Sequence, residues 1–282
     1  MNQTQEESNR SAELESAQGV GVEVTQGPVL LHRERGLAHI RFNRPEALNT
    51  IDVPVAQRFA QICRALAGDP SVRAVVMTGE GRGFGAGGDI SAFSEAALER
   101  VGLIISGMHE GVRILSQMDA PTVAGLHGVV AGGSLSLALS CDLAIAAQGT
   151  RFNLAYVNLA ANCDVSGSFH LPRLVGLRNA MQIALLGETF DVSEAHRLGL
   201  VNRVVAPDAL LAETLALGRR LAEGPTLAMG KLKRLLRSSF DATLDEQLDR
   251  EAACFEDSTR TEDFAEAVQA FLAKRKPVFR GR

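Results

Sequence analysis

Two glycine-rich stretches constrain the fold of this chain most, because each follows a run of apolar residues typical of a buried strand. They read Gly83-Phe84-Gly85-Ala86-Gly87-Gly88-Asp89 and Gly128-Val129-Val130-Ala131-Gly132-Gly133-Ser134. Glycine tolerates positive φ and lets a ligand approach the main chain, so two facing loops of this kind can direct two backbone N–H groups at one oxygen atom. The chain is therefore predicted to contain strands that end in main-chain binding loops.

Length and composition indicate one globular domain that buries its core in water. The chain has 282 residues, 46% of them hydrophobic, and no apolar run approaches the roughly 18 residues that cross a bilayer. The net charge of −4 argues against nucleic acid as a partner, and the missing apolar run argues against a membrane. A basic tail at Lys274-Arg275-Lys276 could contact the phosphates of a small ligand.

Cysteine spacing and the N-terminal composition favour a reduced, cytoplasmic setting. Cys63, Cys141, Cys163 and Cys254 lack the spacing of a metal site, and the N-terminus lacks the apolar core of a signal peptide. We therefore expect no metal. Residues 1–20 are rich in Gln, Glu, Asn and Ser and are predicted to be a disordered leader.

Strand and helix patterns alternate over residues 21–206, which are predicted to form the core domain. Strands are expected at Val29–Arg33, Leu37–Phe42, Arg73–Thr78, Thr122–Leu126 and Leu143–Ala146, and helices at Val55–Leu66, Glu95–Met118 and Ser134–Ser140. This alternation indicates an α/β fold with mainly parallel strand pairing and covering helices.

Residues 207–282 are predicted to be helical throughout. The helices are expected at Ala209–Ala222, Pro225–Leu236, Leu244–Phe255 and Glu262–Lys274. Helices that are segregated after an α/β core suggest a lid or an oligomer arm rather than a second independent domain.

The second glycine loop is the more informative of the two. The first loop fits neither the dinucleotide fingerprint nor a P-loop, and glycine turns of its kind also serve tight packing. In the second loop, Gly132-Gly133 opens the helix predicted after it. A helix start offers unpaired N–H groups and a partial positive charge, so an anionic oxygen is favoured there.

Several ordered motifs identify a family resemblance from about Val29 to the C-terminus. They are Asn43-Arg44-Pro45-Glu46-Ala47-Leu48-Asn49, Ala120-Pro121-Thr122-Val123-Ala124-Gly125, Leu171-Pro172-Arg173-Leu174-Val175-Gly176, Ala195-His196-Arg197-Leu198-Gly199-Leu200-Val201 and Ala270-Phe271-Leu272-Ala273-Lys274-Arg275. With the two glycine loops, they resemble the crotonase family of enoyl-CoA hydratases and isomerases. The resemblance implies a ClpP-like spiral of ββα units with a C-terminal helical trimerisation region, assembled as homotrimers or homohexamers. It implies coenzyme A as part of the substrate and no permanently bound cofactor.

The resemblance also implies which residues form the site. It places two oxyanion donors at the N–H groups of Ala86 and Gly133, and contacts to the adenine and pantetheine of coenzyme A around Ala47, Leu48, Asp89 and Ile90. Further substrate-binding residues expected are Gly87, Gly88, Val130, Gly132, Ser136, Phe271 and Lys274. A thioester carbonyl held by two N–H groups has acidified α-protons, and each donor contributes roughly 3 kcal/mol in the transition state.

The two glutamates that hold water in hydratases of this family are missing. Their positions fall on Ser136 and Tyr156, and neither is a general base near neutral pH without unusual help. Asp164, in Asn162-Cys163-Asp164-Val165-Ser166-Gly167, sits where some isomerases of the family place a catalytic aspartate and where halobenzoyl-CoA dehalogenases place a nucleophile. The loop has Cys163 and Ser166 instead of that subgroup's Pro-Asp-x-Gly.

Each of these residues also has a structural interpretation. Asp164 could be a helix N-cap. Tyr156 could donate a hydrogen bond to Asp164, wall the acyl pocket or be an ordinary half-buried tyrosine. His109 could be a base that activates water, or a surface residue. Cys163 could be a reactive thiol or a small buried hydrophobe.

The sequence most favours an enoyl-CoA isomerase in which Asp164 moves a proton while Ala86 and Gly133 hold the thioester oxygen. Hydratase activity is an alternative, with Tyr156 or Ser136 orienting the water. Another alternative is substitution on an aryl-CoA, with Asp164 as nucleophile and His109 as base. A catalytically silent homologue that binds acyl-CoA or a protein partner also remains.

Overall fold

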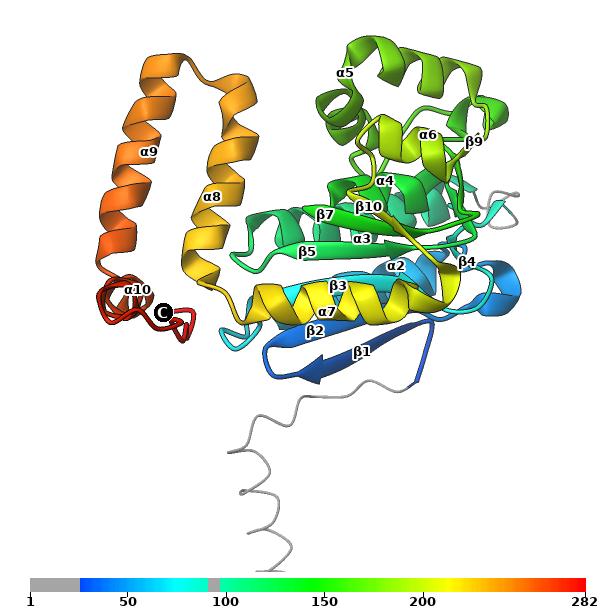
Figure 1. Cartoon of the computed structure of the whole chain (residues 1–282). Helices are drawn as coiled ribbons and strands as arrows, with labels where there is room; N and C mark the ends of the chain where they lie inside the picture. Colours follow the sequence, from blue (N-terminus) through cyan, green and yellow to red (C-terminus); the bar gives the residue numbers. More distant parts are fainter. Residues whose placement is uncertain (1–25, 91–96) are drawn as a thin grey trace, which may run out of the picture.

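The computed structural model describes residues 26–90 and 97–282, whose arrangement is shown in Figure 1. The leader predicted over residues 1–20 lies outside the described part of the chain, as does the start of the helix predicted over Glu95–Met118. The described residues form two sheets, the helices that cover them and a helical arm that stands beside the sheets.

The larger sheet has six strands in the order β1-β2-β3-β5-β7-β10. Its strands are β1 Val29–Glu34, β2 Leu37–Phe42, β3 Ala74–Gly79, β5 Thr122–Leu126, β7 Leu143–Ala147 and β10 Arg203–Val205. β1 and β2 are antiparallel, and every other neighbouring pair is parallel. The predicted α/β fold with mainly parallel pairing is confirmed.

A second sheet, in the order β4-β6-β8-β9, brings the two glycine-rich stretches together. Its strands are β4 Gly83–Gly85, β6 Val129–Ala131, β8 Arg151–Asn153 and β9 Phe190–Asp191. β4 runs parallel to β6, with Gly83 opposite Val129 and Gly85 opposite Val130. Because one strand of each sheet precedes each of the helices α3, α4 and α5, the chain forms the spiral of ββα units that the resemblance implies.

Helices cover both faces of the larger sheet. They are α2 Val53–Ala67 and α3 Ala97–Gln117 on one face and α7 Leu210–Ala222 on the other. Val75 and Met77 of β3 join the core beneath α2 and α3. The alternating neighbours Ala74 and Val76 pack against α7 instead. This two-sided burial explains why β3 is apolar at nearly every position.

The helices α4 Gly132–Ser140, α5 Gly167–Leu186 and α6 Val192–Arg197 complete the body. α5 was not predicted as a helix from the sequence. It is interrupted at Gly176, whose φ of 75° and ψ of 156° are not helical.

The region after residue 206 divides into two parts. α7 packs on the larger sheet, whereas α8 Thr226–Ser238, α9 Leu244–Thr259 and α10 Glu262–Leu272 stand apart from it as a C-terminal arm, residues 226–282 (Figure 1). The helices predicted after residue 207 are all present. Over the ranges 26–90 and 97–282, we find no helix with both the length and the apolar character of a membrane span.

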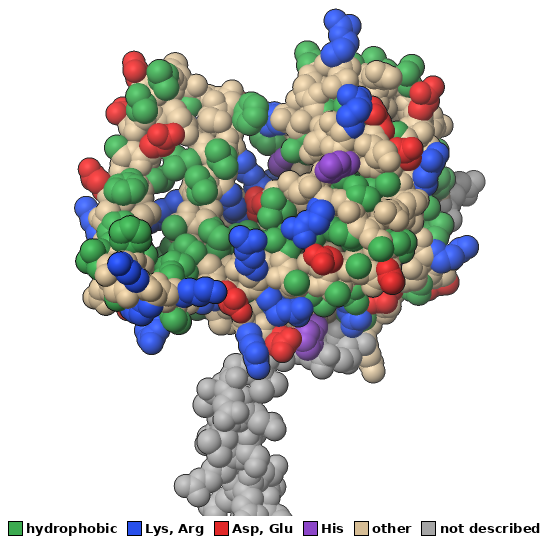
Figure 2. All heavy atoms as spheres, viewed as in Figure 1, with side chains coloured by type: hydrophobic (Ala, Val, Ile, Leu, Met, Phe, Trp, Pro, Cys, Tyr) green, Lys and Arg blue, Asp and Glu red, His purple; other side chains and the backbone are tan. Residues whose placement is uncertain are grey.

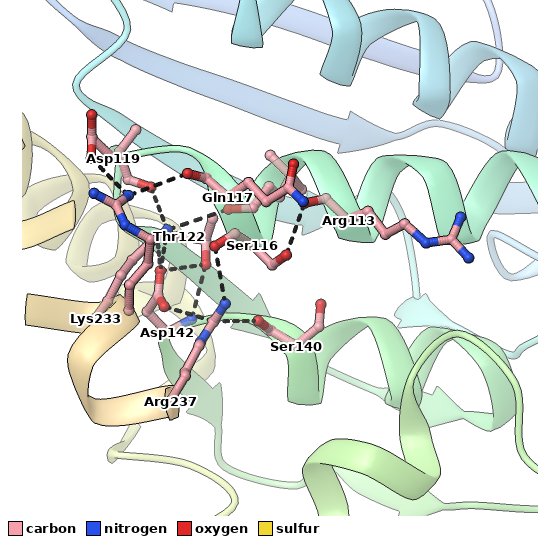
Figure 3. A network of polar contacts seen from close by, with 12 residues as sticks. Arg113, Ser116, Gln117, Asp119, Thr122, Ser140, Asp142, Lys233 and Arg237 are labelled. Atoms are coloured by element: carbon pink, nitrogen blue, oxygen red, sulfur yellow. Dashed lines mark hydrogen bonds and ion pairs between the residues drawn. The ribbon is translucent and has the colours of Figure 1, made fainter. Parts of the chain in front are cut away.

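A polar network fastens α8 to the body (Figure 3). Asp142 forms ion pairs with Lys233 at 3.3 Å and with Arg237 at 2.8 Å. The same cations donate to carbonyls at helix ends, Lys233 to Leu115 of α3 at 3.3 Å and Arg237 to Ser140 of α4 at 3.1 Å. Cations suit helix C-termini because the last carbonyls there have no partner within the helix.

Hydrophobic side chains gather along the arm (Figure 2). A groove of about 800 Å³ runs between α8 and α9, and the leucines Leu232, Leu236 and Leu248 and the ring of Phe255 line it. Each of these side chains is more than half exposed, so the arm carries an apolar face that the body of this chain does not cover.

Candidate active site

The two glycine loops lie side by side at the ends of β4 and β6. A Cβ atom on Gly87 would lie 3.1 Å from the carbonyl oxygen of Ala131 and 3.4 Å from the nitrogen of Gly133. Gly87 has φ 96°, and its N–H donates to the Ser134 hydroxyl at 3.2 Å. The close approach of these loops therefore depends on glycine at position 87.

Gly133 provides a main-chain donor at the start of α4. The helix begins at Gly132, and its N-cap, Ala131, makes no side-chain cap hydrogen bond. The first N–H groups of a helix have no partner within the helix, and the helix dipole favours negative charge beside them. The Gly133 N–H is thus suited to bind an anionic oxygen, as the sequence predicts.

The N–H group of Ala86, which was expected to be a free donor, already has a hydrogen-bond partner. Its N–H donates to the Leu48 carbonyl at 3.0 Å. Leu48 and Asn49 both adopt left-handed backbone conformations, with φ of 50° and 53°, which turn the chain so that this carbonyl faces the first glycine loop.

Asn49 fixes this turn, and sequence reasoning assigned it no role. Its side-chain amide donates to the carbonyls of Glu80 and Gly83, both at 2.8 Å, and its side-chain oxygen accepts the Arg44 N–H at 2.8 Å. Asn49 is only 2% exposed. Its place in the Asn43–Asn49 motif was a signal, but the two carbonyls that its amide bonds lie more than thirty residues further along the chain.

Asp164 lies next to the Gly133 donor. A Cβ atom on Gly133 would be 3.6 Å from Asp164 Oδ1 and 3.6 Å from Val165 Cγ2. The N-cap interpretation of Asp164 is wrong, because the N-cap of α5 is Ser166 and the Asp164 carboxylate bonds to Tyr156 instead. The structure therefore places one half-buried carboxylate beside the predicted anion site.

A chain of two hydroxyls ends on this carboxylate. Tyr156 donates its phenolic hydrogen to Asp164 Oδ1, and the fully buried Ser136 hydroxyl lies 3.1 Å from the Tyr156 oxygen. Burial, and then the charge of Asp164, raises the pKa of Tyr156, so its hydroxyl stays protonated at neutral pH. The two positions where the resemblance expects glutamates therefore hold neutral hydroxyls: Tyr156 bonds Asp164 directly, and Ser136 contacts Tyr156.

His109, on α3, contacts the loop that carries Asp164. Its Nε2 atom accepts the backbone N–H of Val165 at 3.1 Å. The interpretation of His109 as a mere surface residue is wrong, because it is half-buried and holds this specific partner. In the same loop, burial and the charge of Asp164 raise the pKa of the Cys163 thiol, which disfavours a reactive thiolate.

The expected coenzyme A contacts lie along one edge of the glycine loops. Ala47 and Leu48 end a short 3-10 helix, Pro45–Ala47, and Ile90 is 57% exposed. Two main-chain hydrogen bonds connect Ile51 to the first glycine loop. The Ile51 N–H donates to the Gly87 carbonyl at 2.8 Å, and the Asp89 N–H donates to the Ile51 carbonyl at 3.0 Å. A backbone bridge pairs Gly88 with Ile51 as well.

Other candidate residues contribute differently than expected or lie elsewhere. Val130 and Gly132 are buried, so they can offer only main-chain groups to a ligand. Phe271 lies on α10 and is 82% exposed, and Lys274 follows that helix. Figure 1 shows α10 and β4 on opposite sides of the molecule, so this chain does not bring Phe271 and Lys274 to its own glycine loops.

Known proteins share this fold over nearly the whole chain. Residues 32–282 match the family described as enoyl-CoA hydratase/isomerase. The 1,2-epoxyphenylacetyl-CoA isomerase of Escherichia coli K12 is 34% identical, covering 90% of this chain and 98% of that protein. The crotonyl-CoA hydratase of Syntrophomonas wolfei is 31% identical, covering 89% and 97%. A crystal structure from Mycobacterium abscessus, described as a candidate enoyl-CoA hydratase/isomerase, has a TM-score of 0.84 at 36% identity and covers 90% of this chain and 100% of that one.

Proposed function

Because this chain belongs to the enoyl-CoA hydratase/isomerase family, we propose that it isomerises the double bond of an enoyl-CoA thioester, with Asp164 as the proton carrier. One observation carries the proposal: the carboxylate of Asp164 stands beside the Gly133 donor, while hydroxyl groups occupy the two glutamate positions of the hydratases. Moving a proton between two carbons of one substrate requires a single group that can accept and return it.

The reaction follows from this placement. With the thioester oxygen at the N–H groups of Gly133 and Ala86, a proton on the α-carbon of a 3-enoyl chain becomes acidic. Asp164 takes that proton, the two N–H groups stabilise the enolate oxygen, and Asp164 returns the proton to the γ-carbon. Each main-chain donor contributes roughly 3 kcal/mol to the transition state.

The role of Ala86 requires an exchange of hydrogen-bond partner. Its N–H now donates to Leu48, so the thioester oxygen has to replace or share that carbonyl. A structure with a bound acyl-CoA analogue tests this step directly. If the thioester oxygen contacts the Gly133 N–H while the Ala86 N–H stays bonded to the Leu48 carbonyl, the proposed anion site has only one donor.

Asp164→Asn tests the proton carrier. We expect kcat for a 3-enoyl-CoA to fall about 10²- to 10⁴-fold, which is the usual contribution of a positioned acid or base. Coenzyme A affinity should stay unchanged, and deuterium from solvent should no longer enter the α- and γ-carbons. Asp208→Asn, an exposed aspartate after β10, is the matched control. Full turnover by Asp164→Asn would exclude Asp164 from the mechanism.

The relative that acts on an aryl epoxide supports a second candidate reaction. Since the 1,2-epoxyphenylacetyl-CoA isomerase is 34% identical, the substrate panel should include that epoxide as well as aliphatic 3-enoyl thioesters. Isomerisation of the epoxide without exchange on the aliphatic chains would assign an aromatic acyl group to this site.

The remaining alternatives give different products. A 3-hydroxyacyl-CoA product would indicate a hydratase, as in the crotonyl-CoA hydratase relative. An ester trapped on Asp164 would indicate substitution, but the base proposed for that reaction, His109, already accepts the Val165 N–H. Coenzyme A affinity without any turnover would indicate a silent homologue.

We further propose that the chain works in the cytoplasm as a homotrimer or homohexamer. The uncovered apolar groove on the arm supports self-association. All four cysteines are free thiols, which suits a reducing compartment.

A further inference from the structure

We propose that His109 is a positioning residue that holds the loop carrying Asp164 by accepting the main-chain N–H of Val165. The inference rests on the proposed function in one respect, which is that Asp164 is the working carboxylate. It assigns His109 a role other than that of a base, and it links α3 to a loop that lies 56 residues further along the chain.

The loop needs an external support. Val165 and Ser166 have φ of 47° and 65°, and neither is a glycine. A left-handed conformation is especially unfavourable for a β-branched residue such as valine, so it persists only where the surroundings enforce it. Val165 is 2% exposed, and its side chain reaches to within 3.6 Å of a Cβ position on Gly133. A relaxed Val165 would therefore shift the neighbouring Asp164 carboxylate away from the anion site.

Two supports hold Asp164 from opposite ends. Tyr156, in the short helix after β8, bonds its carboxylate, and His109, on α3, bonds the peptide N–H that directly follows it. The Asp164 carbonyl also accepts the Gly167 N–H at 2.9 Å, which closes the turn. Of these contacts, the His109 bond alone ties the turn to α3.

α3 is a firm base for this contact. A Cβ atom on Gly107 would lie 2.8 Å from the Ala56 carbonyl oxygen, so α3 and α2 approach closely on that flank. His109, two residues on, is rotated by about 200° from Gly107 and faces away from α2. Beyond His109, the α8 cations hold the end of α3, with Lys233 bonding the Leu115 carbonyl at 3.3 Å and Arg237 the Ser116 carbonyl at 3.4 Å (Figure 3).

The contact defines the form of the imidazole. An Nε2 atom that accepts a hydrogen bond carries no hydrogen, so this contact requires the ring form with its hydrogen on Nδ1. The lone pair that a general base would use is directed at the Val165 N–H. An imidazolium ring would present a second donor to that N–H and could not hold the loop.

Two nearly isosteric substitutions test the role. Glutamine can place an acceptor oxygen close to the position of Nε2, whereas methionine has a similar shape without a strong acceptor. We expect His109→Gln to keep kcat within a few-fold of the wild type. His109→Met should lower kcat about 100-fold, the size of loss caused by a displacement of about 1 Å in a catalytic group. The KM and the coenzyme A affinity should be alike in both variants, because the residues expected to bind coenzyme A lie on other loops.

Amide hydrogen exchange gives a readout that needs no turnover. The Val165 N–H should exchange faster in His109→Met than in the wild type, and His109→Gln should restore its protection. Equal kcat and equal protection in the two variants would overturn the proposal. Loss of kcat in both variants with the N–H still protected in His109→Gln would show that His109 takes part in the chemistry itself.

The same experiment separates this inference from the proposed function. If the wild type turns over none of the thioesters, the proposed isomerase activity fails. The difference in Val165 N–H exchange between His109→Met and His109→Gln then decides by itself whether His109 holds the loop. Equal protection of this N–H in the two variants would overturn that role.

Discussion

Ser136, Tyr156 and Asp164 form a chain of side chains in which a single group carries charge. The serine hydroxyl lies 3.1 Å from the tyrosine oxygen, and the tyrosine donates to the carboxylate. A hydrogen bond to a charged group contributes about 1.5–3 kcal/mol, so the phenol orients the Asp164 carboxylate. The family resemblance expects two glutamates that hold water at the positions of Ser136 and Tyr156. Their replacement by two hydroxyls supports the proposal that Asp164 carries the proton.

Tyr156 can be tested directly, since it is the only tyrosine in a sequence that has no tryptophan. Burial and the Asp164 charge raise the pKa of Tyr156 above that of a free phenol, so the folded protein should show no phenolate absorption until it unfolds at high pH. Ultraviolet absorption during an alkaline titration measures this, and circular dichroism follows unfolding. Phenolate absorption near the pH of a free phenol, with the fold intact, would contradict the buried Tyr156–Asp164 contact.

Tyr156→Phe is the control for that titration, because it removes the signal. It also removes the hydroxyl that orients Asp164, and we expect kcat to fall about 10- to 100-fold, as the energy of a charged hydrogen bond implies. Coenzyme A affinity should not change. Wild-type turnover in this variant would show that Asp164 needs no help from the phenol.

At the scale of secondary-structure elements, periodicity predicted most long elements, with the exception of α5, and missed the shortest strands. β2 Leu37–Phe42 and β5 Thr122–Leu126 were predicted with the observed bounds, because each is rich in apolar residues and lies between segments that contain Gly or Pro. The second sheet was not predicted, since strands of two or three residues, such as β9 Phe190–Asp191, carry no measurable period. α5 was missed because it contains Pro172, is interrupted at Gly176, and has apolar residues that form no single stripe.

The candidate site was predictable to a similar degree. The adjacency of the loops at Ala86 and Gly133 and the nearness of Asp164 follow from motifs within the sequence. The Ala86–Leu48 and His109–Val165 bonds do not, because each depends on how two separate segments turn in space.

The β2–β3 pair contains a buried histidine, His39, whose titration is expected to change the stability of the fold. His39 Nε2 lies 2.9 Å from the Thr78 hydroxyl, and burial, followed by the charge of Arg41, lowers the pKa of His39 to about 4. An unfolded histidine titrates near 6.5, so between these values the unfolded chain binds more protons than the folded one. Stability is therefore expected to decrease as the pH falls through this window, by up to about 1.4 kcal/mol per pH unit for one such group.

His39→Gln should reduce that slope, because glutamine can bond Thr78 but does not titrate. Urea unfolding of the wild type and the variant between about pH 7 and pH 4.5 measures the difference. His170, whose pKa is also lowered to about 4 mainly by burial, stays in both proteins and leaves a residual slope. Identical slopes for the two proteins would show that folding does not lower the pKa of His39.

At the scale of the whole molecule, the core of the body is covered by the chain itself, whereas the groove of the arm is not. The body encloses its main core between sheets and helices, although α5 leaves apolar side chains such as Leu177 and Leu185 exposed. The α8 cations pair with Asp142 and with helix-end carbonyls of the body (Figure 3). The outer part of the arm has no such cover, and its groove between α8 and α9 remains apolar and open (Figure 2). A second copy of this chain would bury that groove, which is the basis of the proposed trimer or hexamer.

Charges placed in the groove should therefore prevent assembly. Leu232 on α8 and Leu248 on α9 are 56% and 52% exposed within one chain, so Leu232→Glu with Leu248→Glu should leave the fold of the monomer intact. Burying two carboxylates against an apolar partner is costly, so we expect light scattering to report single 30.0 kDa chains where the wild type forms three or six copies. Leu211→Glu on α7, outside the groove and also 52% exposed, is the matched control and should assemble as the wild type does. A wild type that stays monomeric at micromolar concentration, or a groove variant that assembles normally, would show that the arm does not mediate self-association.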